Sequence, residues 1–251
     1  MENNKTLFIE RLKDNFTLEN SKDHIDRYHF AKRFIFKSNI KTLLDCACGM
    51  GYGTKMLACS EGVKKIVGID IDKDSITYAK NENFAPNIEF IRGDILEFES
   101  LSKFDCVISF ETIEHIKEDR LFIQKVNKLL SKRGYLILST PNGRVTNPTR
   151  GEPRNIYHVR EYLPHELFGL VSPYFDICDV YGQYPKRPLA NFMNFLMSFS
   201  PFIKFMIKIR VIFGLNSLFK KTLKSVYKDR LSVMKDSYKY SEVLILICRK
   251  K

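Results

Sequence analysis

The chain has 251 residues, of which 44% are hydrophobic and 28% charged, and its formal net charge is +12. This is the length and composition of one globular domain with a sizeable core. The six cysteines fall mostly in predicted strands or in a buried helix, so a secreted disulfide framework is not expected. The first residues, MENNKTLFIERLKDN, have mixed charge and no apolar core. They do not resemble a signal peptide, and we expect a cytoplasmic protein.

Residues 1–22 are polar and are predicted to form a flexible N-terminus. A helix is predicted over 24–36, where apolar and aromatic residues recur at close to helical spacing. It contains Arg27, Tyr28 and His29. From the pattern alone, a packed and partly solvated helix face explains these three residues as well as a role in a site does.

A glycine-rich turn follows the first predicted strand, 41–46. The apolar run ends in Asp45, and Gly49, Gly51 and Gly53 follow at every second position. Glycine permits positive φ and lets a ligand approach the main chain, and such a turn between a strand and a helix marks a nucleotide-type cofactor site. A carboxylate beside the turn would repel a pyrophosphate but attract an ammonium and a sulfonium, so S-adenosylmethionine is favoured over NAD. Valine at Gly51 is expected to abolish cofactor binding and leave the sheet folded.

The next two predicted strands also end in acids. The strand at 66–69 runs into Asp70, the usual place for a ribose-binding carboxylate, and Asp72 is expected to cap the following helix. A third strand, in NIEFIRGDI, leads to Asp94. Taken without its surroundings, Asp94 is better explained as a turn residue after Gly93.

The fourth predicted strand, 104–110, is apolar and rich in β-branched residues, as a buried strand is. The residues that follow it are Glu111, Thr112, Ile113, Glu114 and His115. Positions beyond the carboxyl end of such a strand face the crevice where ligands bind. His115 is explained either as a residue bonded to backbone at a helix start or as a site residue, and its position favours the site.

A helix at 119–130 and a fifth strand, RGYLILSTPN, lead to a loop at 142–159 that is rich in glycine, proline and asparagine. The loop is longer than a structural connection needs, and we expect it to lie over the same crevice. It carries His158, followed by Arg160 and Glu161. Alternatively, Arg160 and Glu161 form a cap and a salt bridge at the start of a helix beginning at 161, while His158 points inward.

The motifs LLDCACGMGYGT, VGIDID, IRGDI, FDCVISFETIEHI and RGYLILSTPN, in this order and spacing, resemble the class I S-adenosylmethionine-dependent methyltransferases. The likeness is to the ubiquinone-O-methyltransferase-like branch, which includes enzymes of bacterial polysaccharide pathways. It implies an α/β, Rossmann-like sheet of seven strands, the last antiparallel, with helices on both faces, formed by 23–184 and 241–251. By the same resemblance, the helix before the first strand closes over the cofactor, and Asp94 with the next backbone amide meets the adenine. The implied cofactor-binding residues are Asp45, Gly49, Gly51, Gly53, Asp70, Ile71, Asp94, Ile95, Phe110 and Tyr28.

Residues 185–240 are predicted to be a basic and aromatic helical insertion before the last strand. The segment contains twelve cations and two acids, so it carries +10 of the net charge of +12. Its uncharged run, 188–203, has sixteen residues and is shorter than the roughly 20 that a membrane-spanning helix needs. Two explanations have equal weight: a helical cap packed on the domain, or an interfacial helix pair at the anionic inner face of the membrane.

The predicted function is methyl transfer from S-adenosylmethionine to an oxygen of a small molecule, a glycan or a lipid-linked glycan. The predicted catalytic residues are His115, His158 and Glu114, with an imidazole as the base for a neutral hydroxyl. No metal is expected, because Cys46 and Cys48 lack a second pair of ligands. If the acceptor is a carboxylate or a phosphate no base is needed, and arginines of the loop become the important contacts.

Two alternatives remain open from the sequence. The first is an RNA-directed methyltransferase that uses the basic insertion to follow the phosphates. It is disfavoured, because aromatic residues cluster ahead of the basic block instead of alternating with it. The second is a non-catalytic S-adenosylmethionine-binding protein that docks a partner in glycan assembly.

Overall fold

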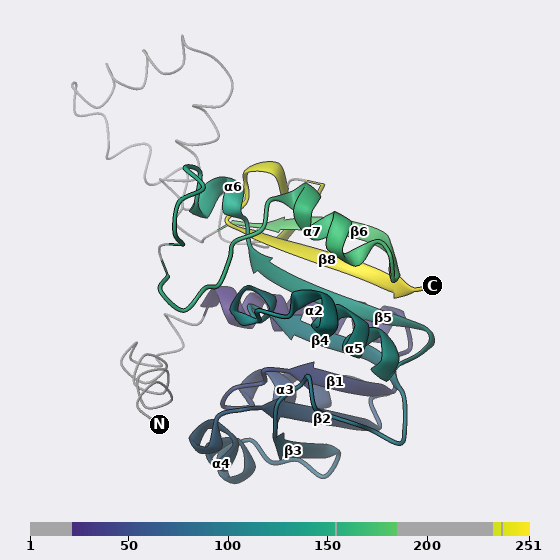
Figure 1. The fold of residues 1–251 in the computed structure, drawn as a ribbon. Helices are drawn as coiled ribbons and strands as arrows, with labels where there is room; N and C mark the ends of the chain where they lie inside the picture. The colour runs from purple at the N-terminus through teal and green to yellow at the C-terminus, as the bar shows by residue number, and fades with distance from the viewer. Residues whose placement is uncertain (1–21, 154, 185–232, 237) are drawn as a thin grey trace, which may run out of the picture. The chain divides into compact units, whose positions relative to one another are not determined.

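The computed structural model describes residues 22–153, 155–184, 233–236 and 238–251. These residues form an eight-stranded sheet in the order β3-β2-β1-β4-β5-β8-β6-β7 (Figure 1). The strands are β1 (Thr42–Cys46), β2 (Lys65–Asp70), β3 (Ile88–Arg92), β4 (Phe104–Phe110), β5 (Leu130–Pro141), β6 (Phe175–Gln183), β7 (Val233–Lys235) and β8 (Val243–Lys250). Strands β3, β2, β1, β4 and β5 are parallel, and β8 is antiparallel to both of its neighbours, β5 and β6.

The seven predicted strands are all present, and the antiparallel last strand is confirmed as β8. The eighth strand, β7, was not expected. It adds to the open edge of β6, where Tyr181 pairs with Lys235, and Lys235 forms an ion pair with Asp179. The structure thus places Val233–Lys235 in the sheet, whereas the prediction assigned these residues to the insertion.

The chain divides into two units, 1–183 with 233–251 and 184–232. The predicted flexible N-terminus and nearly all of the predicted insertion lie outside the described residues, so the membrane contact assigned to 185–240 stays a prediction. Among the residues that are described, no helix combines the length and the apolar character that crossing a membrane requires.

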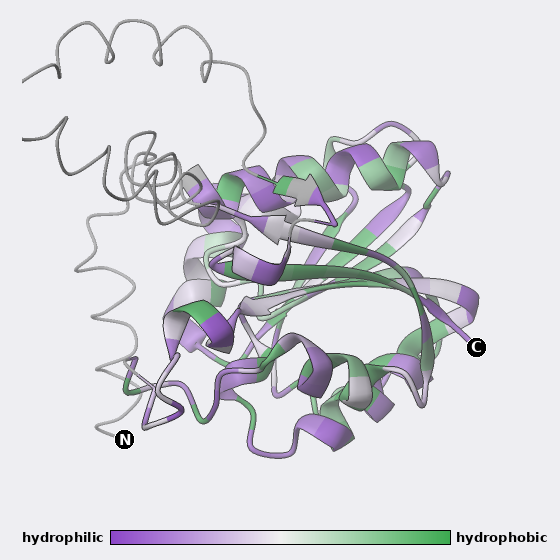
Figure 2. Cartoon of the chain, turned by 90° about the horizontal axis from the view of Figure 1, so that it is seen from above, coloured by the Kyte–Doolittle hydropathy of each residue, from purple (hydrophilic) through white to green (hydrophobic). Residues whose placement is uncertain are grey.

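Helices cover both faces of the sheet, as predicted. Residues of α5 (Asp119–Leu129) and α7 (Pro164–Val171) share one buried cluster with one face of the strands. Residues of α2 (Lys22–Lys37) and α3 (Tyr52–Ala58) share another with the opposite face. In Figure 2 the strands are largely apolar and lie between helices whose colouring alternates between apolar and polar. The fifth long helix, α4 (Lys73–Glu82), packs against the end of the sheet at β3.

The central strands are apolar because both of their sides are covered. In β4, six of seven residues are buried, and successive side chains enter the two different clusters. This continuous apolar pattern is typical of a parallel strand with helices on both faces. The carboxyl ends of β1, β2, β4 and β5 lie at one edge of the sheet, and the turns that follow them hold the candidate site.

Candidate cofactor and acceptor site

The three glycines after β1 have three different environments. Gly49 and Gly51 both have positive φ, +54° and +79°. A Cβ added to Gly49 would meet no atom within 4 Å, so its backbone borders open space that a cofactor can approach. A Cβ on Gly51 would lie 2.6 Å from the ring of Phe90, and one on Gly53 would lie 2.0 Å from the ring of Tyr28. The close approach of a ligand stays a prediction for all three glycines, and packing is a separate reason for glycine at Gly51 and Gly53.

Asp70, the predicted ribose ligand, ends β2 and fixes the glycine turn. Its Oδ2 accepts a hydrogen bond from the Gly49 amide at 2.8 Å, and its Oδ1 accepts one from the Asp72 amide at 2.9 Å. Each carboxylate oxygen can accept a further bond, so this geometry is compatible with the predicted ribose contact. Asp72 accepts a bond from the Ser75 amide at 2.7 Å and caps α4, which confirms the predicted cap.

Asp45, which the resemblance places at the cofactor, is fully buried at the end of β1. It accepts hydrogen bonds from Thr54 Oγ1 at 2.6 Å and from the Tyr28 hydroxyl at 3.3 Å. Burial raises the pKa of Asp45 to about 7, an effect that these two hydrogen bonds oppose and the charge of Asp70 reinforces. The carboxyl group is buried against Tyr28, and its predicted contact with the cofactor stays a prediction.

Aromatic rings form a wall beside the glycine turn. Tyr28 makes edge-to-face contacts with Phe110 and Tyr52, with ring centroids 5.2 and 5.8 Å apart. Burial and the nearby Asp45 raise the pKa of Tyr28 well above its usual value, so its hydroxyl stays protonated and donates to Asp45. The predicted residues Tyr28 and Phe110 are thus brought together. Tyr52 was missed, because a single tyrosine between Gly51 and Gly53 has no distinctive spacing.

The structure resolves the two explanations of the first helix. Arg27 and Tyr28 of α2 are buried, whereas His29 is exposed. Arg27 Nη1 donates to Gln183 Oε1 at 2.6 Å, and Gln183 Nε2 donates to the Asp23 carbonyl at 2.7 Å. These bonds join α2 to β6 across the end of the sheet. Arg27 therefore belongs to the interior around the site, and His29 does not.

Three predicted cofactor-binding residues, Ile71, Asp94 and Ile95, lie after β2 and β3. Ile71 is 62% exposed, an unusual position for a large aliphatic side chain and one that leaves it open to an apolar ring. Ile95 is buried, and Asp94 is exposed and accepts a hydrogen bond from the Leu96 amide at 2.8 Å. Asp94 thus forms the local turn expected from its position after Gly93, and its contact with adenine stays a prediction.

Glu111, directly after β4, has a backbone conformation that is rare for its residue type, with φ of +49°. Its amide donates to the Ser139 carbonyl at 3.1 Å, and its Oε1 accepts a bond from Ser139 Oγ at 2.8 Å. Bonds to the end of β5 therefore hold a strained backbone in place, which is common at functional sites. The sequence placed Glu111 in the cluster but gave no reason to favour it, because local periodicity does not reveal a positive φ.

Glu114 is the buried acid of this cluster. It lies in the short helix η1 (Ile113–His115) with no exposed surface, and its Oε2 accepts a bond from Thr140 Oγ1 at 2.8 Å. Its other oxygen, Oε1, has no hydrogen-bond partner among the described residues. Burial, together with the charge of Glu111, raises the pKa of Glu114 well above its usual value, although Arg27 and the hydrogen bonds oppose this. The raised pKa favours the protonated form of this carboxyl group more than in an exposed glutamate.

The structure brings the two predicted histidines together from separate loops. The rings of His115 and His158 lie edge to face with centroids 4.8 Å apart. His115 Nδ1 lies 3.0 Å from the Tyr157 carbonyl, and because a carbonyl only accepts, this nitrogen carries the proton. His158 Nδ1 lies 3.0 Å from Glu161 Oε1, and its Nε2 lies 3.1 Å from Asn155 Nδ2. In both rings Nε2 is therefore the basic nitrogen.

Glu161 orients His158 and does not cap a helix. Its second oxygen accepts a bond from Thr146 Oγ1 at 2.5 Å, which holds the carboxylate in place. The helix expected to begin at 161 begins at Pro164, where Glu166 Oε2 accepts the Leu163 amide at 2.8 Å. The capping role suggested for Glu161 is therefore wrong, and the pair with His158 replaces it. Arg160 forms a salt bridge with Asp119 at 2.7 Å. The sequence suggested a salt bridge for Arg160 but did not identify its partner.

Glu114, His115 and His158 each offer one ligand atom to a metal ion, and these atoms lie within 4.8 Å of one another. Two imidazoles and a carboxylate form a donor set that suits zinc, iron and other divalent transition metals. The expectation that there is no metal considered only the cysteines. The expected absence of a metal stays a prediction, and the cluster of Glu114, His115 and His158 is a specific alternative to it.

Comparison with known proteins gives this geometry its context. Residues 37–172 match the family model described as a methyltransferase domain. The chain belongs to the methyltransferase domain family. Among its relatives is a probable S-adenosylmethionine-dependent methyltransferase of Mycobacterium tuberculosis, 27% identical over 154 residues, which are 59% of this chain and 55% of that relative. A ubiquinone biosynthesis O-methyltransferase of Pelagibacter ubique is 32% identical over 41% of this chain and 43% of its own length. The chain thus spans about half the length of the curated relatives that it matches.

The N-methyltransferase NodS of Bradyrhizobium japonicum, solved with S-adenosyl-L-homocysteine, has a similar fold. The two structures superpose with a TM-score of 0.62 over 98% of each chain at 15% sequence identity. The predicted fold is confirmed by this likeness, and the predicted cofactor, S-adenosylmethionine, by the family and its relatives. The ubiquinone-type branch is matched only distantly.

Proposed function

We propose that the methyltransferase transfers the methyl group of S-adenosylmethionine to a hydroxyl oxygen of a small molecule or a glycan, including a lipid-linked glycan. The observation that carries the proposal is the pairing of His115 with His158 beyond the end of β4, next to the strand β1 that ends in the glycine turn. An oxygen acceptor is further supported by the similarity of the chain to a ubiquinone biosynthesis O-methyltransferase.

The chemistry asks little of the protein apart from placement. The sulfonium is already activated, so the acceptor oxygen, the methyl carbon and the sulfur must be held in line in a site that excludes water. The aromatic wall of Tyr28, Tyr52 and Phe110 supplies apolar surface beside the turn. As the oxygen–carbon bond forms and the carbon–sulfur bond breaks, the hydroxyl proton must leave, and an imidazole Nε2 is the acceptor.

His158 is the better oriented of the two candidate bases. Glu161 fixes its tautomer and stabilises the imidazolium that proton transfer would create. In the present arrangement the Asn155 amide donates to its Nε2, so an acceptor hydroxyl has to displace this bond. His115 is more exposed, and its Nδ1–H donates to a backbone carbonyl and not to a carboxylate.

The test is turnover by single alanine variants of His115 and His158, with His29→Ala as the matched control on the exposed face of α2. Donor consumption is measured against pools of nucleotide sugars, lipid-linked glycans and RNA. We expect the variant of the base to lose roughly 10²–10⁴ in kcat and to keep its affinity for S-adenosylmethionine. Near-normal turnover in both variants would refute the assignment. Turnover with RNA alone would favour the RNA-directed alternative, and none in any pool would favour the non-catalytic one.

A second way to activate the hydroxyl is supported by Glu114. Its Oε1 is buried and has no hydrogen-bond partner among the described residues, and the nearest candidate ligands are two imidazoles. A divalent cation held there would coordinate the acceptor oxygen and lower its pKa. The cation would also keep Glu114 ionised. The two mechanisms exclude each other at a given nitrogen, because an imidazole nitrogen bound to a metal cannot accept a proton.

A further inference from the structure

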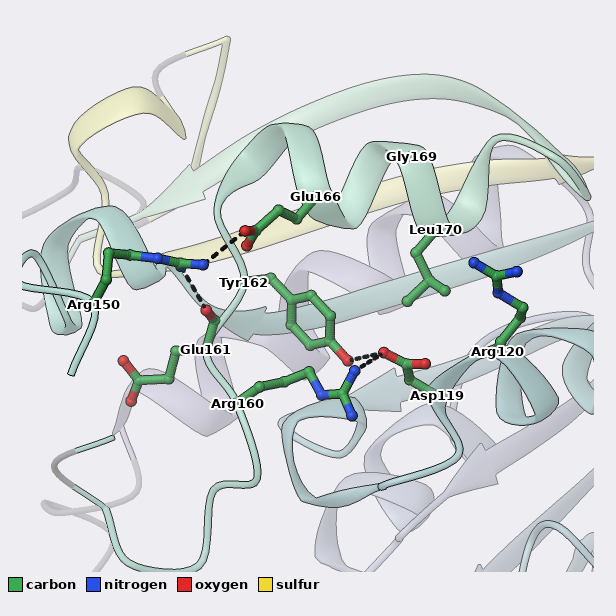
Figure 3. A pocket seen from close by; sticks show the side chains of 9 residues that line it. All are labelled: Asp119, Arg120, Arg150, Arg160, Glu161, Tyr162, Glu166, Gly169 and Leu170. Atoms are coloured by element: carbon green, nitrogen blue, oxygen red, sulfur yellow. Dashed lines mark hydrogen bonds and ion pairs between the residues drawn. The ribbon is translucent and has the colours of Figure 1, made fainter. Parts of the chain in front are cut away.

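A cavity of about 440 Å³ lies outside the cofactor and acceptor site, between the start of α5, the segment before α7, and α7 itself (Figure 3). Three arginines line it, Arg120, Arg150 and Arg160. We call it the arginine pocket. We propose that it binds a phosphate group, and, resting on the proposed function, that this is a phosphate carried by the methyl acceptor.

Two of the arginines are held in place by carboxylates. Arg150 Nη2 bonds to Glu166 at 2.7 Å and its Nη1 bonds to the Glu161 carbonyl at 3.3 Å. Arg160 Nη1 bonds to Asp119 at 2.7 Å. A guanidinium has five N–H donors, so each retains donors for an anion after these bonds. Both side chains are also nearly half exposed, 46% and 42%, so they can be reached from solvent.

Arg120 lies in the first turn of α5, where a positive charge opposes the helix dipole. Within the described part of the chain it has no ion-pair partner, and Figure 3 shows its guanidinium across Leu170 from the other two arginines. The N-cap position of α5 makes no side-chain hydrogen bond to the first turn. An anion in the pocket would compensate the positive charge of Arg120 and would accept hydrogen bonds from the uncapped backbone amides at the start of α5.

Gly169 supplies an independent observation. It lies inside α7, where glycine is among the least favourable residues, and a Cβ there would meet no atom within 4 Å. Neither packing nor a positive φ therefore requires glycine at this position. Its effect is to leave one wall of the pocket open, as a pocket that admits a ligand requires.

The charge balance of the pocket favours an oxyanion. Apart from Glu161, the acids of the lining are Asp119 and Glu166, so the three arginines leave one positive charge uncompensated. The carboxylate of Glu161 is directed away from the pocket, and it holds His158 instead. A planar guanidinium suits the oxygens of phosphate, to which it bonds in a bidentate manner.

Glu161 also links the arginine pocket to the acceptor site. Its backbone carbonyl accepts from Arg150 at the pocket, while its side chain accepts from His158. A phosphorylated acceptor can therefore place its phosphate on one side of this residue and its hydroxyl on the other. The pocket would then select phosphate-bearing acceptors.

Binding is tested first, by calorimetric titration of inorganic phosphate into the whole protein. Arg120→Gln is expected to weaken binding about tenfold or more, the effect of losing a charge-assisted hydrogen bond. Gly169→Leu is expected to abolish binding by filling the pocket, without lowering the unfolding temperature, because leucine favours the helix. Lys128→Gln, which removes an equal charge elsewhere on α5, is the control. Wild-type affinity in both pocket variants, or an equal loss in the control, would overturn the proposal.

Turnover then separates the acceptor's phosphate from free phosphate. If the phosphate belongs to the acceptor, inorganic phosphate inhibits turnover competitively with the acceptor, and Arg120→Gln raises KM for it with kcat retained. Phosphate binding that depends on Arg120 but leaves turnover unchanged would overturn the assignment to the acceptor. Failure of the proposed methyl transfer would show as absent turnover, which does not affect the titration.

Discussion

Alanine at Gly49 and alanine at Gly51 should act on different properties of the methyltransferase, although both glycines have positive φ. A Cβ in the left-handed region costs about 1–2 kcal/mol, so both variants lose this amount of stability. At Gly51 the new Cβ would also lie 2.6 Å from Phe90 and 2.8 Å from the Cβ of Ala79. Overpacking of this kind adds about 1–3 kcal/mol. We therefore expect losses of about 1–2 kcal/mol for Gly49→Ala and about 2–5 kcal/mol for Gly51→Ala.

Cofactor affinity should follow a different pattern from stability. The Gly49 Cβ would project into the open space beside the turn, so Gly49→Ala should weaken S-adenosylmethionine binding while the protein remains folded. This differs from the expectation from sequence alone, in which a substitution at Gly51 leaves the sheet intact. Urea unfolding measures the first quantity and calorimetry the second. The reasoning fails if both variants are equally stable, or if Gly49→Ala binds the cofactor normally.

Three other predictions concern neighbouring residues. Asp70→Ala should weaken S-adenosylmethionine binding by about 1.5–3 kcal/mol, because it removes a charged hydrogen-bond acceptor; unchanged affinity by calorimetry in a folded variant would rule out the ribose contact. The pKa of Asp45 rises from 3.8 to about 7 on folding, so its protonated form stabilises the native state below pH 4 and this contribution is lost as the pH rises through 7. Between pH 4 and 8 the unfolding free energy of the wild type should therefore fall by up to about 4 kcal/mol more than that of Asp45→Asn. Identical pH profiles of the two proteins would disprove the raised pKa of Asp45. If His115 or His158 acts as a base, dialysis against EDTA should leave turnover intact. The metal mechanism would be established instead if EDTA abolished turnover and zinc or manganese restored it in the wild type but not in Glu114→Gln.

The sequence by itself determined the features that depend on local pattern. The continuous apolar run FDCVISF predicts a buried parallel strand, and β4 has those bounds. Asp72 before SITYAKNEN predicts a helix cap, because the capping bond spans only three residues. The position of the glycine turn, between a strand and a helix, follows from the same kind of short-range chemistry. Even the meeting of His115 with His158 could be expected, because both follow strands whose carboxyl ends lie at one edge of a parallel sheet.

Only the tertiary structure decided which partner each of these residues has. Gly51 is confined by Phe90 and Gly53 by Tyr28, and both contacts join segments that are distant in the chain. Glu161 binds Thr146, which lies 15 residues earlier, because the loop after β5 turns back on itself, which no periodicity encodes. The edge strand β7 forms because β6 leaves an open row of backbone donors and acceptors, although its own sequence, Val-Met-Lys, is too short to predict a strand. The physical reason is the same in each case: these contacts become favourable only after the sheet has brought distant segments together, so they are properties of the fold and not of any local stretch of residues.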